Sequence, residues 1–206
     1  MERTLDQSER SAGTGVTRIA FYSDARGWGG AEVYLTDLVS RIGRYGYEPH
    51  VFRSDRRVTD AWADDLASRG VPVGIFRPTG ELDPRGYFEA LGILRGFDLV
   101  HVNKPHPRTC LPGIVAARHA GARAVVTTEH LAQSPVSHYP GGAAFLTWLI
   151  ARVNRSVDRT IAVSELSRRA LARNYGVRED RLLAIPNGTD LSAFAKGTDR
   201  AAVRRS

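Results

Sequence analysis

Cysteine is nearly missing from this sequence, and its scarcity limits the chemistry open to the protein. The 206 residues contain one cysteine, Cys110, which cannot close a disulfide within the chain. The spacing of cysteine and histidine does not resemble a zinc site, so we expect no structural metal. Because disulfides are rare in the cytosol, the composition fits a reducing compartment, and we expect a cytoplasmic protein.

Long apolar runs are missing as well. The longest apolar-leaning segment, Gly141–Val153, is shorter than the roughly 18–20 residues that a membrane-spanning helix needs. Residues 1–15 are polar and contain no apolar stretch of the kind found in secretory signals, so we expect a flexible leader there. Any membrane contact is therefore expected to be peripheral, at the inner membrane face.

Lysine is scarce, and arginine supplies nearly all of the positive charge. Lys104 and Lys196 are the only lysines, and the formal net charge is +7 at pH 7. The arginines are spread along the chain without interleaved aromatic residues, which is unlike a nucleic-acid-binding surface. We therefore expect no nucleic-acid partner, whereas a phosphate-bearing substrate or an anionic membrane suits the charge.

The apolar residues that are present alternate between strand and helix patterns. Val16–Tyr22 is a short β-branched and aromatic run, and from Ala31 to Tyr45 apolar residues recur at helical spacing. Further strands are predicted at Pro49–Arg53, Val71–Phe76, Asp98–Val102, Ala124–Thr128, Arg159–Val163 and Arg181–Ile185. Further helices are predicted at Thr59–Arg69, Pro84–Arg95, Arg108–His119, Gly142–Ser156 and Glu165–Tyr175.

This alternation predicts an α/β fold with a doubly wound, mostly parallel, Rossmann-like sheet. We place the domain at residues 16–189, and residues 190–206 at a linker or the start of a second, incomplete domain. Ligands of such sheets bind beyond the carboxyl ends of the strands. The candidate loops begin at Ser23, Asn103, Glu129, Ser164 and Asn187.

The loop after the first strand is rich in glycine and precedes a helix. Gly29 and Gly30 let the backbone approach an anionic group, which the N–H groups at the start of the helix would face. The loop departs from the dinucleotide fingerprint at Glu32, where glycine or alanine is required, and it has no Walker lysine. A tight turn that packs strand against helix is the alternative interpretation.

The segment GGAEVYLTDLVSRI, from Gly29 to Ile42, is similar to the opening of the family 4 glycosyltransferases of GT-B fold. Later segments resemble the successive strand-end segments of that family: DLVHVNKP (98–105), VVTTEH (125–130), DRTIAVSELSRRAL (158–171) and VREDRLLAIPNGTDLSAF (177–194). The resemblance implies the N-terminal half of a retaining, two-domain enzyme. The C-terminal nucleotide-binding domain is then absent from this chain.

The resemblance also implies a reaction, in which a sugar moves from a nucleotide-sugar donor to a glycan, lipid-linked or small-molecule acceptor. The donor is a substrate, so no cofactor or metal is expected. The C-terminal domain would act in cis or in trans, and this chain alone is expected to show little or no turnover. A non-catalytic module that binds a glycan or head group stays open, as does a Rossmann oxidoreductase, which the incomplete fingerprint disfavours.

Three residues acquire roles on the donor side from this resemblance. Gly29 and Gly30 would place backbone amides against the donor diphosphate. His130, after the fifth strand, would lie beside the transferred sugar as the catalytic residue. An imidazole there would hydrogen-bond a sugar hydroxyl or help to stabilise charge at the reacting centre.

Polar residues after the fourth strand are candidates for binding the acceptor. Asn103, Lys104 and His106 gather hydrogen-bond donors there, and the lysine would pair with an anionic acceptor. His101 lies inside the strand run, where a buried core histidine is an equally good interpretation. We therefore favour Asn103 and Lys104 over His101.

Two more strand-end residues, Glu129 and Ser164, complete the predicted acceptor-binding set. Ser164 also has a plain structural interpretation, as the N-cap of the following helix. The loop 131–142, with His138 and Tyr139, suits either a mobile flap over the acceptor or an ordinary loop. The helix 143–155 has a basic and apolar pattern that fits a membrane surface, although we favour packing of its apolar face in the core.

Overall fold

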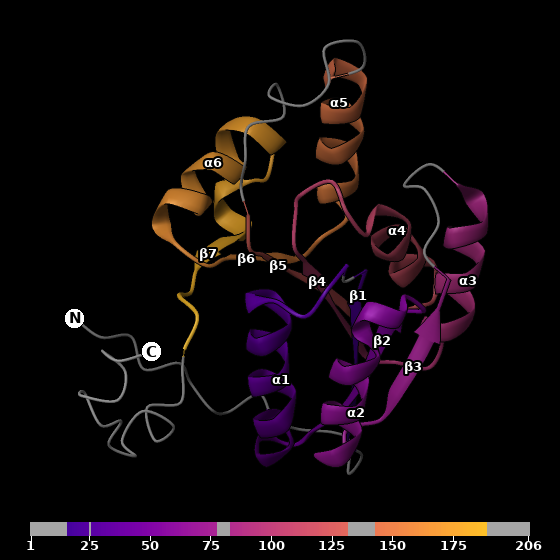
Figure 1. Ribbon diagram of the computed structural model, residues 1–206. Coiled ribbons are helices and arrows are strands. Elements are labelled where there is room, and N and C mark those ends of the chain that lie inside the picture. Colours follow the sequence, from indigo (N-terminus) through magenta and orange to yellow (C-terminus); the bar gives the residue numbers. More distant parts are fainter. Residues whose placement is uncertain (1–15, 25, 78–82, 132–142, 189–206) are drawn as a thin grey trace, which may run out of the picture.

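The computed structural model describes residues 16–24, 26–77, 83–131 and 143–188. Over these residues, seven strands form one parallel sheet in the order β3-β2-β1-β4-β5-β6-β7. Helices cover both faces of the sheet (Figure 1). The doubly wound, Rossmann-like α/β fold is therefore confirmed. The predicted leader, the linker at 190–206, and the loop with His138 and Tyr139 lie outside the described residues.

The strands and helices follow the predicted alternation. The strands are β1 (Thr17–Ser23), β2 (Tyr47–Ser54), β3 (Val73–Phe76), β4 (Leu99–Lys104), β5 (Ala124–Glu129), β6 (Arg159–Ala162) and β7 (Leu182–Ala184). The helices are α1 (Gly30–Ile42), α2 (Asp60–Ser68), α3 (Pro84–Leu94), α4 (Leu111–His119), α5 (Ala143–Asn154) and α6 (Glu165–Tyr175). Short 3-10 turns lie at Gly43–Tyr45, Arg57–Thr59 and Glu179–Arg181.

One helix begins later than its apolar pattern suggests. We predicted a start near Arg108, whereas α4 starts at Leu111. Proline in the first turn of α4 suits a helix start, because its missing N–H is not needed there. Cys110 is the N-cap residue of α4, and its φ of 62° lies in the left-handed region. The helical conformation therefore begins only after Cys110. The residues from 105 to 110 thus form a loop at the carboxyl end of β4.

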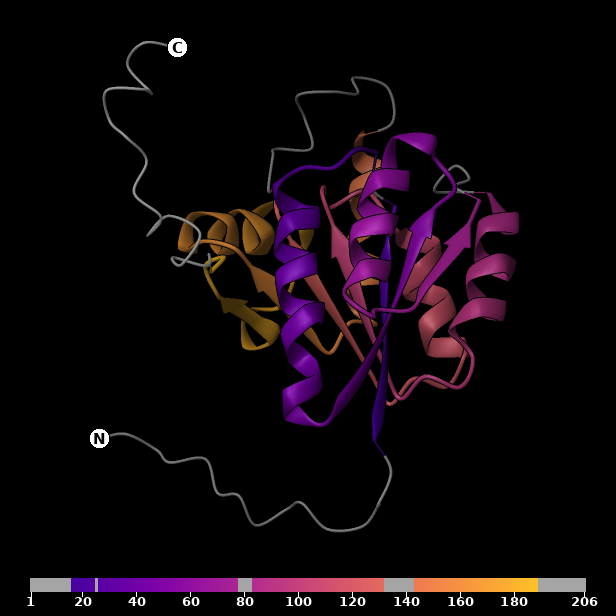
Figure 2. The same cartoon turned by 60° about the horizontal axis from the view of Figure 1, so that its bottom comes forward.

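Two apolar clusters form the core, one on each face of the sheet. On one face, α1 and α2 cover β1 and β2 through a cluster that contains Phe21, Leu35, Val51, Trp62 and Leu66. On the other face, residues of α3, α4, α5 and α6 pack together against the strands in a larger cluster. Figure 2 shows these two helix layers on either side of the sheet.

The order of the strands reverses at β1, and this reversal positions the site. The chain leaves β1 towards β2 and β3, and then returns to pair β4 with the opposite edge of β1. The loops after β1 and after β4 therefore diverge at the carboxyl ends of two adjacent strands. A crevice forms at such a switch point in open α/β sheets.

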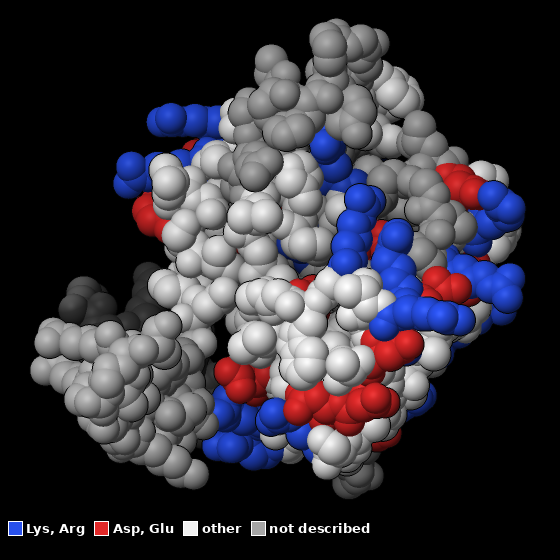
Figure 3. Space-filling view, viewed as in Figure 1, with Lys and Arg blue, Asp and Glu red and all other residues white. Residues whose placement is uncertain are grey.

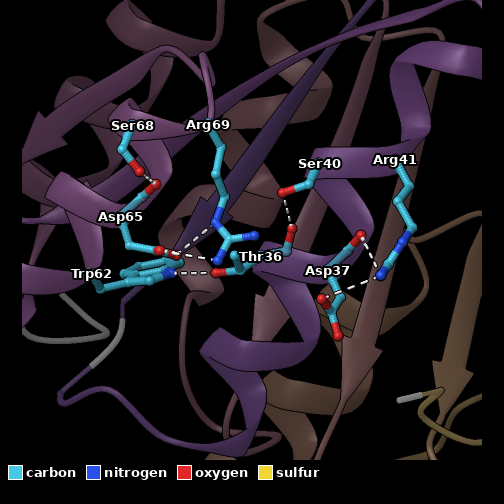
Figure 4. A network of polar contacts seen from close by, with 8 residues as sticks. All are labelled: Thr36, Asp37, Ser40, Arg41, Trp62, Asp65, Ser68 and Arg69. Carbon is cyan, nitrogen blue, oxygen red and sulfur yellow. Dashed lines mark hydrogen bonds and ion pairs between the residues drawn. The ribbon is translucent and has the colours of Figure 1, made fainter. Parts of the chain in front are cut away.

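A buried hydrogen bond joins α1 to α2. The indole N–H of Trp62 donates to Thr36 Oγ1 over 2.9 Å, and both side chains are buried. On the more exposed sides of the two helices, Arg41 pairs with Asp37 and Arg69 pairs with Asp65, each one helical turn apart (Figure 4). The buried bond satisfies the indole N–H in an otherwise apolar cluster.

Replacing Trp62 by phenylalanine should destabilise the domain. The change removes the indole N–H and leaves unfilled volume, so we expect the free energy of unfolding to fall by about 1–3 kcal/mol. Trp148→Phe is the matched control, because Trp148 is 60% exposed, and we expect a change within about 0.5 kcal/mol. Urea unfolding followed by circular dichroism measures both. An equal loss of unfolding free energy in the two variants would show that the buried contacts of Trp62 do not stabilise the domain more than those of an exposed tryptophan.

Candidate functional site

A cavity of about 720 Å³ lies at the switch point between β1 and β4. Its size suits a small molecule. Its walls come from the loop after β1, the first turn of α1, the loop after β4, the residue that follows His130, and α5. The lining residues are Arg26, Gly27, Trp28, Gly29, Glu32, Pro105, His106, Arg108, Thr109, Leu131 and Leu146. Of the predicted site residues, Gly29 and His106 therefore line the cavity directly.

The glycine loop is closed by a hydrogen bond to the side chain of Glu32. Gly29 is the N-cap of α1, and its amide donates to Glu32 Oε2 over 2.9 Å. Burial raises the pKa of the Glu32 carboxyl, and the hydrogen bond from Gly29 opposes that rise. The Gly29 amide is thus already engaged, whereas the Gly30 amide has no hydrogen-bond partner among the described residues. Sequence reasoning placed Glu32 in the first turn but missed it as a wall of the cavity.

Neither backbone conformation nor packing explains the glycines of this loop. Gly27, Gly29 and Gly30 are absent from the described residues with positive φ. A Cβ added at Gly27 or Gly30 would meet nothing within 4 Å, and one at Gly29 would meet Glu32 Oε2 at an ordinary 3.5 Å. The alternative interpretation, a tight turn that needs glycine for close packing, therefore lacks support within the described part of the chain.

His130 lies next to the start of α1. Its Nε2 is 2.9 Å from Asn103 Oδ1, and the Asn103 amide N–H donates to the Ala31 carbonyl over 3.4 Å. The imidazole also meets the ring of Tyr34 edge-on, with 5.1 Å between ring centroids. Burial lowers the pKa of His130 to about 4. The structure thus brings His130 and the residue that follows Gly30 into one hydrogen-bonded chain.

His101 lies deeper in the sheet. It is 6% exposed, and its Nε2 is 2.8 Å from Thr128 Oγ1. Burial, with a smaller effect from His130, lowers its pKa to about 4, so it is neutral at pH 7. This arrangement fits the core-histidine interpretation.

Lys104 and Glu129 form a buried ion pair below the site. Lys104 Nζ lies 2.8 Å from Glu129 Oε1 and donates to the Pro107 carbonyl over 2.8 Å. The two side chains are 0% and 1% exposed. Burial raises the pKa of the Glu129 carboxyl, and Lys104 opposes that rise. In this structure the lysine therefore pairs with Glu129 instead of facing an anionic acceptor.

Ser164 has the structural role that we gave as the alternative. It is the N-cap of α6, and its Oγ accepts a hydrogen bond from the Ser167 amide over 3.0 Å. Ser164 does not line the cavity between β1 and β4.

The sequence analysis did not identify two arginines of the cavity wall as site residues. Arg26 and Arg108 flank the cavity together with His106. Figure 3 shows basic side chains gathered over the loop after β1 and the first turn of α2. Because Lys104 is the only described lysine and is buried, these exposed side chains are arginines. The signal in the sequence was an arginine directly beside the glycine loop and another beside the predicted acceptor residues.

The α5 helix presents two different sides. We favoured core packing of its apolar face; Ile150 and Val153 are buried in the core, but two aromatic residues of that face are not. Phe145 and Trp148 are 59% and 60% exposed, and their rings stack with 5.9 Å between centroids. Across the described residues, no helix is long and apolar enough to span a bilayer. The described residues also hold no group of three or more histidine, cysteine, aspartate or glutamate side chains placed to bind a metal ion.

Comparison with known proteins identifies relatives of this chain. The family model described as Glycosyltransferase Family 4 matches residues 28–193. A D-inositol 3-phosphate glycosyltransferase of Nocardiopsis dassonvillei is 29% identical over 198 residues, which cover 86% of this chain and 45% of the relative. One from Kineococcus radiotolerans is 27% identical over 199 residues, covering 85% and 44%. The chain thus spans less than half the length of these curated relatives.

Solved structures share the fold at low sequence identity. A Staphylococcus aureus MnaA–UDP co-structure has a TM-score of 0.62 at 14% identity, covering 89% of this chain and 48% of that one. Sucrose-phosphate synthase of Thermosynechococcus elongatus has a TM-score of 0.60 at 14% identity, covering 92% and 53%. These likenesses support the fold.

Removing one partner of the buried ion pair should be costly. Lys104→Met leaves the Glu129 carboxylate buried without its cation, so we expect the free energy of unfolding to fall by about 3–5 kcal/mol at pH 7. Replacing both residues, with Lys104→Met and Glu129→Leu, removes both charges and should recover most of that loss. Urea unfolding compares the variants. A double variant no more stable than the single one would contradict this account.

Proposed function

This chain belongs to Glycosyltransferase Family 4, and we propose that its domain holds the acceptor and one side of a nucleotide-sugar donor during a retaining sugar transfer. One observation carries the proposal. Gly30 at the start of α1 and His130 at the end of β5 are linked through Ala31 and Asn103, beside the cavity at the switch point. This is where the fold places ligands.

The donor diphosphate is proposed to lie at the start of α1. The N-terminus of a helix attracts anions through its free N–H groups and its dipole. The Gly30 amide is free to meet a diphosphate oxygen, and open space beside Gly27 and Gly30 lets the backbone approach it. The Gly29 amide would take part only if it released Glu32.

The acceptor is proposed to carry a phosphate and to occupy the cavity. Arg26, Arg108 and His106 supply positive charge and hydrogen-bond donors on its wall. The relatives from Nocardiopsis dassonvillei and Kineococcus radiotolerans bear the name of a D-inositol 3-phosphate glycosyltransferase, and an inositol phosphate suits this wall. Lys104 and Glu129 would act beneath the cavity by shaping its floor, because both are buried.

The reaction needs charge to be stabilised at two points. In a retaining transfer the bond from the sugar to the diphosphate breaks, the sugar becomes oxocarbenium-like, and negative charge grows on the diphosphate. Backbone amides at the start of α1 would stabilise that negative charge. His130 would lie beside the sugar as a neutral imidazole, since its pKa is about 4.

A second domain is part of the proposal. The curated relatives are more than twice as long as the portion that this chain matches, since it covers 45% and 44% of them. We propose that a nucleotide-binding domain, in cis or in trans, holds the base and the other side of the diphosphate. A membrane-bound acceptor would place Phe145 and Trp148 at a lipid surface, whereas a small acceptor needs no such contact.

Substituting the cavity arginines should weaken binding of a phosphate-bearing acceptor. For Arg26→Gln and for Arg108→Gln we expect D-inositol 3-phosphate to bind about tenfold more weakly, because each loses a charge-assisted hydrogen bond. Arg123→Gln is the control, since Arg123 is 77% exposed and precedes β5, at the opposite end of the sheet. Calorimetric titration of the 206-residue chain measures all three. Equal affinity of all three variants for D-inositol 3-phosphate would show that the acceptor does not bind in this cavity.

Sugar transfer should depend on both domains. We expect little or no transfer or donor hydrolysis by the 206-residue chain alone, and a gain when the nucleotide-binding domain of a relative is added. In that mixture, His130→Ala should lower kcat about a hundredfold, in the range found when a polar group at a reacting centre is lost. Binding of acceptor without any gain would favour the non-catalytic module. Full turnover by the chain alone would contradict the proposed division of the site.

A further inference from the structure

Asn103 is held in one orientation by the start of α1. It is completely buried, and its two polar atoms point to different partners. Its Nδ2 donates to the Ala31 carbonyl over 3.4 Å, and its Oδ1 lies 2.9 Å from His130 Nε2. A flipped amide would set its oxygen against the Ala31 carbonyl, placing two acceptors together. The carbonyl of Ala31 therefore fixes which atom of Asn103 faces the imidazole.

The orientation of Asn103 decides where the proton of His130 lies. An amide oxygen accepts hydrogen bonds and cannot donate one, so His130 Nε2 must be the donor. In a neutral imidazole the other nitrogen, Nδ1, then carries no proton. Nδ1 has no hydrogen-bond partner among the described residues, and His130 is only partly buried next to Leu131, which lines the cavity, so Nδ1 is the ring nitrogen left to meet a ligand.

We infer that Asn103 is a positioning residue that holds the His130 proton on Nε2 and so presents Nδ1 to the ligand as a hydrogen-bond acceptor. The inference rests on the proposed function, because it assigns the ligand-facing nitrogen of that site. It limits which hydrogen bonds His130 can make to the ligand. A bare Nδ1 accepts a hydrogen bond from a sugar hydroxyl, whereas it cannot donate one to the departing diphosphate.

The surroundings of His130 support a neutral ring. Within the described part of the chain, the groups that face it are the Tyr34 ring from α1, Asn103 from β4 and, more deeply, His101. None of these is an anion that would favour a second proton. Burial lowers the pKa of His130 to about 4, so the ring carries one proton near pH 7.

Nitrogen-15 NMR of the labelled 206-residue chain at pH 7 tests the inference directly. Long-range correlations distinguish the protonated from the bare nitrogen of each histidine, and His130→Gln identifies the signals of His130 by their loss. We expect a protonated Nε2 and a bare Nδ1. A proton on Nδ1, or rapid averaging between the two nitrogens, would overturn the inference. This experiment needs no sugar transfer.

Substitutions of Asn103 test whether it positions the His130 proton or only stabilises the fold. Asn103→Leu removes the acceptor, so the His130 signals should shift towards a mixture of both protonation sites. Asn103→Asp keeps an acceptor and adds a negative charge, so the midpoint of the His130 titration should rise by about 1–3 pH units while the neutral ring keeps its proton on Nε2. If Asn103→Leu does not fold, the titration of Asn103→Asp decides alone, and an unchanged midpoint would overturn the inference.

Thr128→Val is the matched control. It removes a buried hydroxyl that lies 2.8 Å from His101 Nε2 and 3.5 Å from the Tyr34 hydroxyl, and it leaves Asn103 and Ala31 in place. We expect it to destabilise the fold without moving the His130 proton, and a moved proton would contradict the role of Asn103. The experiments can reject the inference and the proposed function independently of each other. A proton on Nδ1 with intact sugar transfer rejects only the inference, whereas a proton on Nε2 in a protein that transfers no sugar rejects only the function.

Discussion

The strand order around β1 is the constraint on which the site depends. Because β2 and β4 pair with opposite edges of β1, the loops that follow β1 and β4 must separate, and no packed layer fills the space between them. The same parallel arrangement brings the end of β5, with His130, to that edge of the sheet. Residues far apart in the sequence therefore lie close together at the mouth of the cavity.

The floor of this mouth is polar, and its buried side chains contact one another and the neighbouring backbone. Asn103 contacts the Ala31 carbonyl and His130, and Lys104 pairs with Glu129, its register partner on the adjacent strand β5. Removing charges and amides from water is costly unless partners compensate, so these contacts leave little freedom for the residues above them. They tie His130 and the loop from Pro105 to Thr109 to the floor, and a site for a small polar ligand requires such support.

The sequence predicted the fold well because the fold depends on local periodicity. Val16–Tyr22 and the helical spacing from Ala31 onward identify β1 and α1 without knowledge of their neighbours. The roles of Lys104 and Glu129 could not be found in this way. Whether a strand-end lysine faces solvent or a carboxylate depends on the register between β4 and β5, and no local pattern encodes that register. The likeness to family 4 located His130, but its link to Asn103 appeared only when the two strands were aligned.

The hydrogen bond between the Gly29 amide and Glu32, at the start of α1, has a consequence for any anion that binds there. Glu32 places a negative charge on the Gly29 amide, and burial already favours the protonated form of that carboxyl. An approaching diphosphate would raise the carboxyl's proton affinity further, or displace it from the amide. If an anion binds at this end of the cavity, its binding would therefore be coupled to proton uptake by Glu32.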